Sequence, residues 1–148
     1  MQADTELEPA PPAAEPAPSL ARVTLNADAD FDFDKAELRA SGRAKLDQLA
    51  AQLRTMEYGS VNVVGHADRI GSQQYNHHLS LLRAQAVKDY LVSQQIDRER
   101  IETQGVGASQ PVTQPRDCEG MKKKALINCL QPDRRVEVGA EGTKVMRN

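Results

Sequence analysis

A short apolar strand, a long helix and a second strand follow one another in the middle of this chain, and this series constrains the fold most. Residues 60–66 alternate valines between two faces, which is typical of a strand covered on both sides. The pattern predicts a helix over about 75–94 and another strand over 101–105. Parallel strands joined by a helix form a right-handed crossover. The centre of the chain therefore indicates an α/β domain.

The segments on either side of this unit complete the predicted domain. Val23 and Leu25 share one parity, as in a half-buried strand, and leucines on one arc predict a helix over 37–56. A short helix is expected over 118–130 and a last strand over about 134–140. We predict an α/β two-layer sandwich in the order βαβαβ(α)β, with a mixed sheet and helices on one face.

Composition divides the chain into a tail and one domain. With 148 residues, 39% of them hydrophobic, and no Trp, the chain can form one domain with an aliphatic core. Five prolines in residues 8–18 favour an extended spacer, and a disordered terminus is the alternative. We expect a Pro/Ala-rich flexible linker or tail over 1–20, the folded domain over 21–142 and a C-terminal tail over 143–148.

Charge and hydropathy exclude two classes of function. The net charge is −2, and basic residues alternate with acidic ones without a basic stripe, so no nucleic-acid partner is expected. The lysines at 122–124 indicate a solvated helix face. No apolar run is long enough for a membrane span, and no cleavable signal follows Met1, so we expect a mature fragment.

Charged and amide side chains gather where a loop leads into the long helix. Asn76, Ser80 and Arg83 fall at i, i+4 and i+7 on one stripe, and the preceding loop supplies Asp68. A neighbouring apolar stripe is expected to pack on the core, and it consists of Leu79, Leu82, Ala86 and Tyr90. A fixed carboxylate and a fixed guanidinium suit a ligand that carries both an ammonium and a carboxylate, such as an amino-acid end.

The two cysteines predict one local disulfide. Cys118 and Cys129 are an even pair on a loop-helix segment, which indicates an oxidising compartment. Two buried reduced thiols are the alternative, and a zinc site lacks the accompanying ligand spacing. Closing this loop would stabilise the fold by roughly 2 to 3 kcal/mol. Because the segment follows the motif in sequence, we expect little effect of the bridge on ligand affinity.

Several blocks of the sequence occur in an order that is typical of one family. They are Phe31-Asp32-Phe33-Asp34-Lys35, then Asp68 and Gly71, then Asn76, Leu79, Ser80, Arg83 and Ala84, then Gly105-Val106-Gly107, and last Asp133-Arg134-Arg135-Val136. Over about residues 20–142 the chain resembles the OmpA-like (OmpA/MotB C-terminal) peptidoglycan-binding domain, and most of all its OmpA and neisserial Rmp-type members. Ala67 and Ala108 depart from the family pattern of Thr and Glu, and Ala67 removes one hydrogen bond from the pocket.

The resemblance implies that the site binds the diaminopimelate residue of a peptidoglycan stem peptide. Asp68 would take the ammonium of that residue and Arg83 its carboxylate. The other positions carried over to the pocket are Asn76, Asp34, Gly71, and Arg134 or Arg135. The implied function is non-covalent binding that tethers the outer membrane to the cell wall, without catalysis, cofactor or metal.

The resemblance also implies a location and a set of partners. We expect the periplasmic domain of an outer-membrane-associated protein in a Gram-negative envelope. The alternative function is a protein-interaction module that docks on outer-membrane porins or on itself, as a homodimer. The absence of a lipobox cysteine argues against the lipoprotein members of the family, and the absence of a membrane helix argues against its flagellar stator members.

Catalytic and metal-binding alternatives use some of the same residues. Ser80, His66 and Asp68 can be written as a hydrolytic triad, but no G-x-S-x-G elbow exposes Ser80 from its helix. A metal site at His66, His77 and His78 is disfavoured, because the last two diverge by about 100° on a helix and are expected to face solvent.

Two further alternatives concern the carboxylates. Calcium binding is disfavoured, because the EF-hand spacing of Gly and Glu is missing around the acidic residues Asp28, Asp30, Asp32 and Asp34. Asp68 can also be read as the cap of the long helix, paired with Arg83 for stability alone.

Overall fold

The computed structural model describes residues 18–32 and 35–144. Its strands, α-helices and short 3-10 helices (η) are β2 (Pro18–Asn26), α1 (Ala27–Asp30), α2 (Ala40–Leu53), β3 (Met56–His66), α3 (Gln73–Ser93), η1 (Arg98–Arg100), β4 (Ile101–Gly105), α4 (Lys123–Cys129), η2 (Gln131–Asp133) and β5 (Arg135–Lys144). The predicted pocket residue Asp34 and most of the predicted linker lie outside the described residues. None of the helices in the described part of the chain has the length and apolar character needed to cross a membrane.

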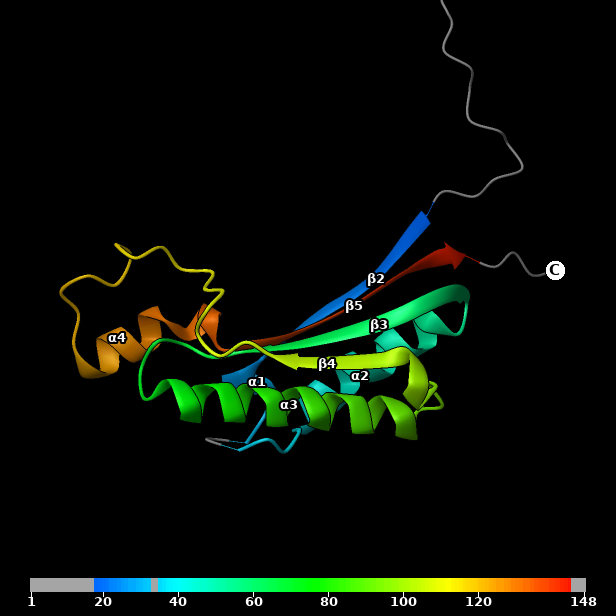
Figure 1. The fold of residues 1–148 in the computed structure, drawn as a ribbon, viewed down its shortest axis with the longest axis horizontal. Coiled ribbons are helices and arrows are strands. Elements are labelled where there is room, and N and C mark those ends of the chain that lie inside the picture. The colour runs from blue at the N-terminus through cyan, green and yellow to red at the C-terminus, as the bar shows by residue number, and fades with distance from the viewer. Residues whose placement is uncertain (1–17, 33–34, 145–148) are drawn as a thin grey trace, which may run out of the picture.

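The four strands form one mixed sheet in the order β2-β5-β3-β4. β5 is antiparallel to both β2 and β3, whereas β3 and β4 are parallel and joined through α3. Figure 1 shows α1, α2 and α3 along one side of the sheet and α4 beyond its end. The predicted mixed α/β architecture is confirmed. β5, the last strand in the sequence, lies inside the sheet and pairs with the first strand, β2. It therefore brings the end of the domain beside its beginning.

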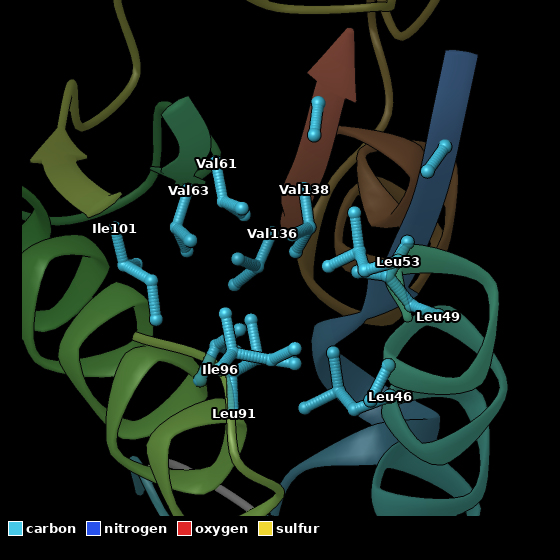
Figure 2. Close-up of a cluster of buried hydrophobic side chains, with 14 of the residues drawn as sticks. Leu46, Leu49, Leu53, Val61, Val63, Leu91, Ile96, Ile101, Val136 and Val138 are labelled. Atoms are coloured by element: carbon cyan, nitrogen blue, oxygen red, sulfur yellow. The ribbon is translucent and has the colours of Figure 1, made fainter. Parts of the chain in front are cut away.

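Aliphatic side chains fill the space between the sheet and helices α2 and α3 (Figure 2). The fully buried members include Leu46, Leu53, Val61, Val63, Leu91 and Val136. The opposite side of β3 is different, because Asn62 is exposed and Val64 is only half-buried. The expectation that this strand is covered on both faces is therefore wrong. A sheet with helices on one side leaves its other side to water.

The buried face of α3 differs from the predicted apolar stripe. Leu82 is 37% exposed, and the buried positions are Asn76, Ser80, Arg83, Ala84, Val87 and Leu91. Glycines explain this rotation. A Cβ on Gly65 would lie 2.0 Å from the carbonyl oxygen of Ser80, and one on Gly105 would lie 2.6 Å from the amide nitrogen of Leu81. These glycines let the backbone of α3 approach the sheet closely at Ser80 and Leu81, so this side of the helix faces inward together with its polar stripe.

Element boundaries also differ from the prediction at the ends of the sheet. β2 begins at Pro18 and pairs there with Thr143 of β5, so the expected boundary after residue 20 falls within a strand. β2 is an edge strand, where a proline costs no ladder hydrogen bond. The helix predicted over 118–130 is shorter, because α4 covers only Lys123–Cys129.

Candidate ligand-binding site

A cleft of about 500 Å³ lies where β3 ends and α3 begins. Four of the side chains predicted for the site line it, and they are Asp68, Asn76, Arg83 and Arg134. They come from distant parts of the chain: the loop after β3, α3, and the residue before β5. The cleft therefore brings together the end of a central strand, one helix and the C-terminal strand.

Arg134 bridges two carboxylates at this cleft. Its Nη1 donates to Asp68 Oδ2 at 2.6 Å, and its Nε and Nη2 donate to Asp28 Oδ1 and Oδ2 at 3.1 and 2.7 Å. The hydrogen bonds from Asp28 and then Asp68 raise the pKa of Arg134 above its ordinary value, and burial opposes them only in part. Two carboxylates share one guanidinium, so this side of the cleft keeps a formal charge of −1, which suits a cationic group.

Arg83 is fixed at the cleft by the chain around it. Only 6% of its surface is exposed, as expected for an anchored side chain. Its Nε donates to the backbone oxygen of Lys35 at 3.0 Å. Its guanidinium carbon lies 5.6 Å from the centre of the Phe31 ring, within the range of a cation–π contact. A planar guanidinium held in this way is pre-organised for a carboxylate.

Asn76 shapes the loop that carries Asp68. Its Nδ2 donates to the backbone oxygens of Asp68 and Ile70, at 3.0 and 2.9 Å. The amide of Ile70 in turn donates to Asp68 Oδ1 at 2.9 Å, which orients the carboxylate. Asn76 therefore positions the acidic side of the cleft.

The cap of α3 is Ser72, whose Oγ accepts from the amide of Tyr75 at 3.0 Å. The alternative in which Asp68 caps this helix is therefore wrong. Gly71 has a φ of +95°, a conformation that favours glycine, and it lines a neighbouring cavity beside Asn76. Gly71 thus makes the turn into α3, and the structure places it next to the cleft instead of in its lining.

Arg135 points away from the cleft, so the prediction that it lines the pocket is wrong. Its Nε donates to Glu137 Oε2 at 2.7 Å, and its Nη1 and Nη2 donate to the backbone oxygens of Asp133 and Gln110. Successive residues of an extended strand project to opposite sides. Of the two arginines that the motif left open, only Arg134 lines the cleft.

The structure adds Asp28 and Ile127 to the site, and sequence reasoning missed both. Asp28 belongs to the acidic run for which calcium was considered, so a signal was present. Its neighbours serve the fold, because Asp30 is buried against Lys45 and Ser41, and Asp32 pairs with Arg39. Residues 18–32 and 35–144 contain no group of three or more His, Cys, Asp or Glu placed to hold a metal.

The residues of the hydrolytic alternative do not form a triad, because Ser80 bonds elsewhere. The Oγ of Ser80 donates to the backbone oxygen of His77 at 2.9 Å and accepts from the amide of Gly107 at 3.1 Å. Among the described residues, neither ring nitrogen of His66 makes a hydrogen bond, and the nearest carboxylate contact is 3.5 Å from Nε2 to Glu137 Oε1. Ser80 therefore ties α3 to the loop after β4. His77 and His78 are exposed, as expected.

The predicted disulfide is present between Cys118 and Cys129, with an S–S distance of 2.05 Å and a Cα–Cα distance of 5.8 Å. It closes the segment that contains α4, and Ile127 of that helix lines the cleft. The bridged segment is thus not remote from the ligand site, contrary to the expectation drawn from its place in the sequence.

Comparison with known proteins shows the family of the chain. The model of the OmpA family matches residues 30–125. The chain belongs to the OmpA family. It is similar to outer membrane protein A of Shigella flexneri, with 47% identity over 136 residues, covering 90% of this chain and 39% of that protein. It is also 49% identical to outer membrane protein A of Escherichia coli O157:H7, covering 82% of this chain and 36% of that protein. The chain thus spans less than half the length of these two OmpA-family relatives.

Solved structures show the same family fold. The cell wall anchor of the T6SS from Pseudomonas aeruginosa is 27% identical, with a TM-score of 0.64, covering 86% of this chain and 82% of that one. The OmpA-like domain of FopA1 from Francisella tularensis is 25% identical, with a TM-score of 0.63, covering 88% of this chain and 78% of that one.

Proposed function

We propose that this domain binds peptidoglycan through the diaminopimelate residue of the stem peptide. The observation that carries the proposal is one cleft lined by the Asp68–Arg134–Asp28 group and by the anchored Arg83. Diaminopimelate ends in an ammonium and a carboxylate on its side chain, which matches an acidic and a basic group in one cleft. Membership of the OmpA family and the likeness to a cell wall anchor support the same ligand.

Asp68 takes the ammonium in this proposal, and Arg83 takes the carboxylate. Both oxygens of Asp68 already accept one hydrogen bond, from Ile70 and from Arg134. A carboxylate oxygen has two lone pairs, so Asp68 keeps capacity for a further donor. Asp28, at the other side of Arg134, adds negative potential. The methyl group of Ala67 lines the cleft where many family members carry a threonine hydroxyl, so affinity depends more on the charged groups.

In the cell, the domain would tether the outer membrane to the wall from the periplasmic side. The relatives named outer membrane protein A support this location, and the Cys118–Cys129 disulfide fits an oxidising compartment. Porin partners and a homodimer stay predictions.

The test is sedimentation of the purified protein with peptidoglycan sacculi free of other envelope proteins. We expect Asp68→Ala and Arg83→Ala to abolish co-sedimentation. Asp89 and Arg98 provide matched controls, because they form an exposed ion pair on the far end of α3, and Asp89→Ala and Arg98→Ala should bind as the wild type does. Circular dichroism of each variant checks the fold.

Release of soluble fragments from the sacculi would show an enzyme instead, and absence of binding by folded wild-type protein would favour a protein-docking module. Specificity is tested by titration calorimetry with diaminopimelate-type and lysine-type stem peptides. Lysine lacks the second carboxylate, so the ligand makes no ion pair with Arg83, and we expect an affinity on the order of tenfold weaker. Equal affinities would contradict the role given to Arg83.

A further inference from the structure

Three exposed apolar side chains converge on the ligand cleft. Ile70, Tyr75 and Ile127 are 40%, 48% and 47% exposed, and all three line the cleft together with Leu79. They come from the loop after β3, from α3 and from α4. Exposed apolar side chains that gather around one concavity mark a surface for apolar ligand groups. These four side chains form an apolar wall of the cleft, and the charged groups of the proposed site do not explain why it is there.

The disulfide-closed segment, residues 118–129, supplies one part of that wall. None of the seven residues of α4 is buried, so the helix itself packs only weakly on the domain. The bridge to Cys118, which is 1% exposed, and the buried Leu130 just after the helix hold it against the body of the domain. The position of Ile127 therefore depends on this bridge and on the chain that follows it.

We propose that the disulfide-closed segment adds an apolar subsite to the ligand cleft, and that this subsite takes the D-alanine attached to diaminopimelate in the stem peptide. The inference rests on the proposed function. The two neighbours of diaminopimelate in a stem peptide differ in chemistry, since one is a glutamate with a free carboxylate and the other is an alanine with a methyl group. An apolar wall formed by Ile127, Ile70 and Tyr75 fits the methyl group of the alanine, whose terminal carboxylate stays in solvent.

The volume of the cleft agrees with a ligand longer than one residue. At about 500 Å³ it lies within the range of roughly 300–1,000 Å³ that is typical of sites for drug-sized ligands. Diaminopimelate is a single residue, and the wall to which α4 contributes Ile127 borders the same cleft.

The experiment compares two ligands that differ by one methyl group, the stem tetrapeptide that ends in D-alanine and its analogue with glycine at that position. We expect the wild type to bind the D-alanine tetrapeptide about fourfold more tightly, which corresponds to about 0.8 kcal/mol for one buried methyl group. Ile127→Ala should remove this preference, so that the two peptides bind with equal affinity. The matched control is Val112→Ala, which truncates an exposed apolar side chain outside the cleft.

Each outcome is decisive. Equal binding of the two peptides by the wild type, or an undiminished preference in Ile127→Ala, would overturn the subsite while the proposed function stands. Failure of the folded wild type to bind either peptide would instead overturn the proposed function. A double variant, Cys118→Ser with Cys129→Ser, should lose the preference for the D-alanine tetrapeptide in the same way while circular dichroism shows a folded domain. If this double variant kept the full preference for the D-alanine tetrapeptide, the claim that the disulfide-closed segment forms the subsite would be wrong.

Discussion

Gly65 lies where α3 crosses β3 at backbone contact, and its replacement by alanine tests the close packing that positions the cleft. The new Cβ would lie 2.0 Å from the carbonyl oxygen and 2.8 Å from the carbonyl carbon of Ser80. Carbon and oxygen atoms approach to about 3.3 Å at the closest in such contacts, so α3 must move by more than about 1 Å. The backbone of α3 cannot relieve this contact by changing a rotamer, as a flexible side chain could.

Overpacking of this kind costs about 1–3 kcal/mol, and occasionally more, and the rigid neighbour places Gly65→Ala at the upper end. We expect the free energy of unfolding in urea to fall by about 3 kcal/mol. Gly59 provides the control on the same strand, because nothing lies within 4 Å of a Cβ there. Gly59→Ala should change stability by less than about 1 kcal/mol.

A second substitution tests the mechanism. Gly105 is the ladder partner of Gly65 on β4, and its Cβ would lie 2.6 Å from the amide nitrogen of Leu81. If α3 has already moved away in Gly65→Ala, adding Gly105→Ala should cost less than it does alone. Because α3 carries Asn76 and Arg83, the single variants should also bind sacculi more weakly. A Gly65→Ala protein within about 1 kcal/mol of the wild type would refute the packing argument.

Two buried polar groups give further predictions. Burial has the largest effect on the pKa of His66 and lowers it below 6.5. The nearby Arg135 lowers it further, whereas Glu137 opposes the shift. The unfolded chain therefore binds a proton that the folded state excludes. The free energy of unfolding should therefore be highest above pH 6.5 and fall as the pH drops below it. Urea titrations at several pH values should show that this free energy depends less on pH in His66→Gln than in the wild type. An identical pH dependence in the two proteins would contradict the prediction. Burial raises the pKa of Asp30, but hydrogen bonds from Lys45, Ser41 and the Asn26 amide outweigh it and lower the pKa overall. Asp30→Ala should cost about 1–3 kcal/mol in urea unfolding, and the exposed control Asp32→Ala less than about 1 kcal/mol; equal costs would argue against the buried network.

Local patterns were sufficient for part of this protein. The series of strand, helix and strand predicted the parallel pair β3 and β4 because the period of the apolar residues changes from two to 3.6 between them. The same local geometry placed Asn76 and Arg83 on one side of α3 and Asp68 at the end of β3. Two cysteines on one short segment allow only one pairing within the chain, and the predicted bridge is present.

The buried face of α3 and the choice between neighbouring arginines depended on packing. Contact at Gly65 and Gly105 turns α3 so that its polar stripe continues into the core, and no count of apolar residues along the helix reveals such a contact. Arg134 and Arg135 are equivalent in the sequence motif. The path of the chain into β5 sends one to the cleft and the other to Glu137.

The sequence by itself determined most of the helix and strand pattern, the pairing of the two cysteines and the chemical character of the candidate site. Only the tertiary structure decided which distant residues complete that site. Arg134 reaches Asp28 across 106 positions, because β5 pairs between β2 and β3 and brings the end of the chain beside its beginning. Ile127 reaches the same cleft through the disulfide-closed segment. The acidic run marked Asp28 as a candidate, but neither contact can be predicted from the local sequence, because the pairing of strands and the docking of a loop depend on surfaces that form only when the chain has folded.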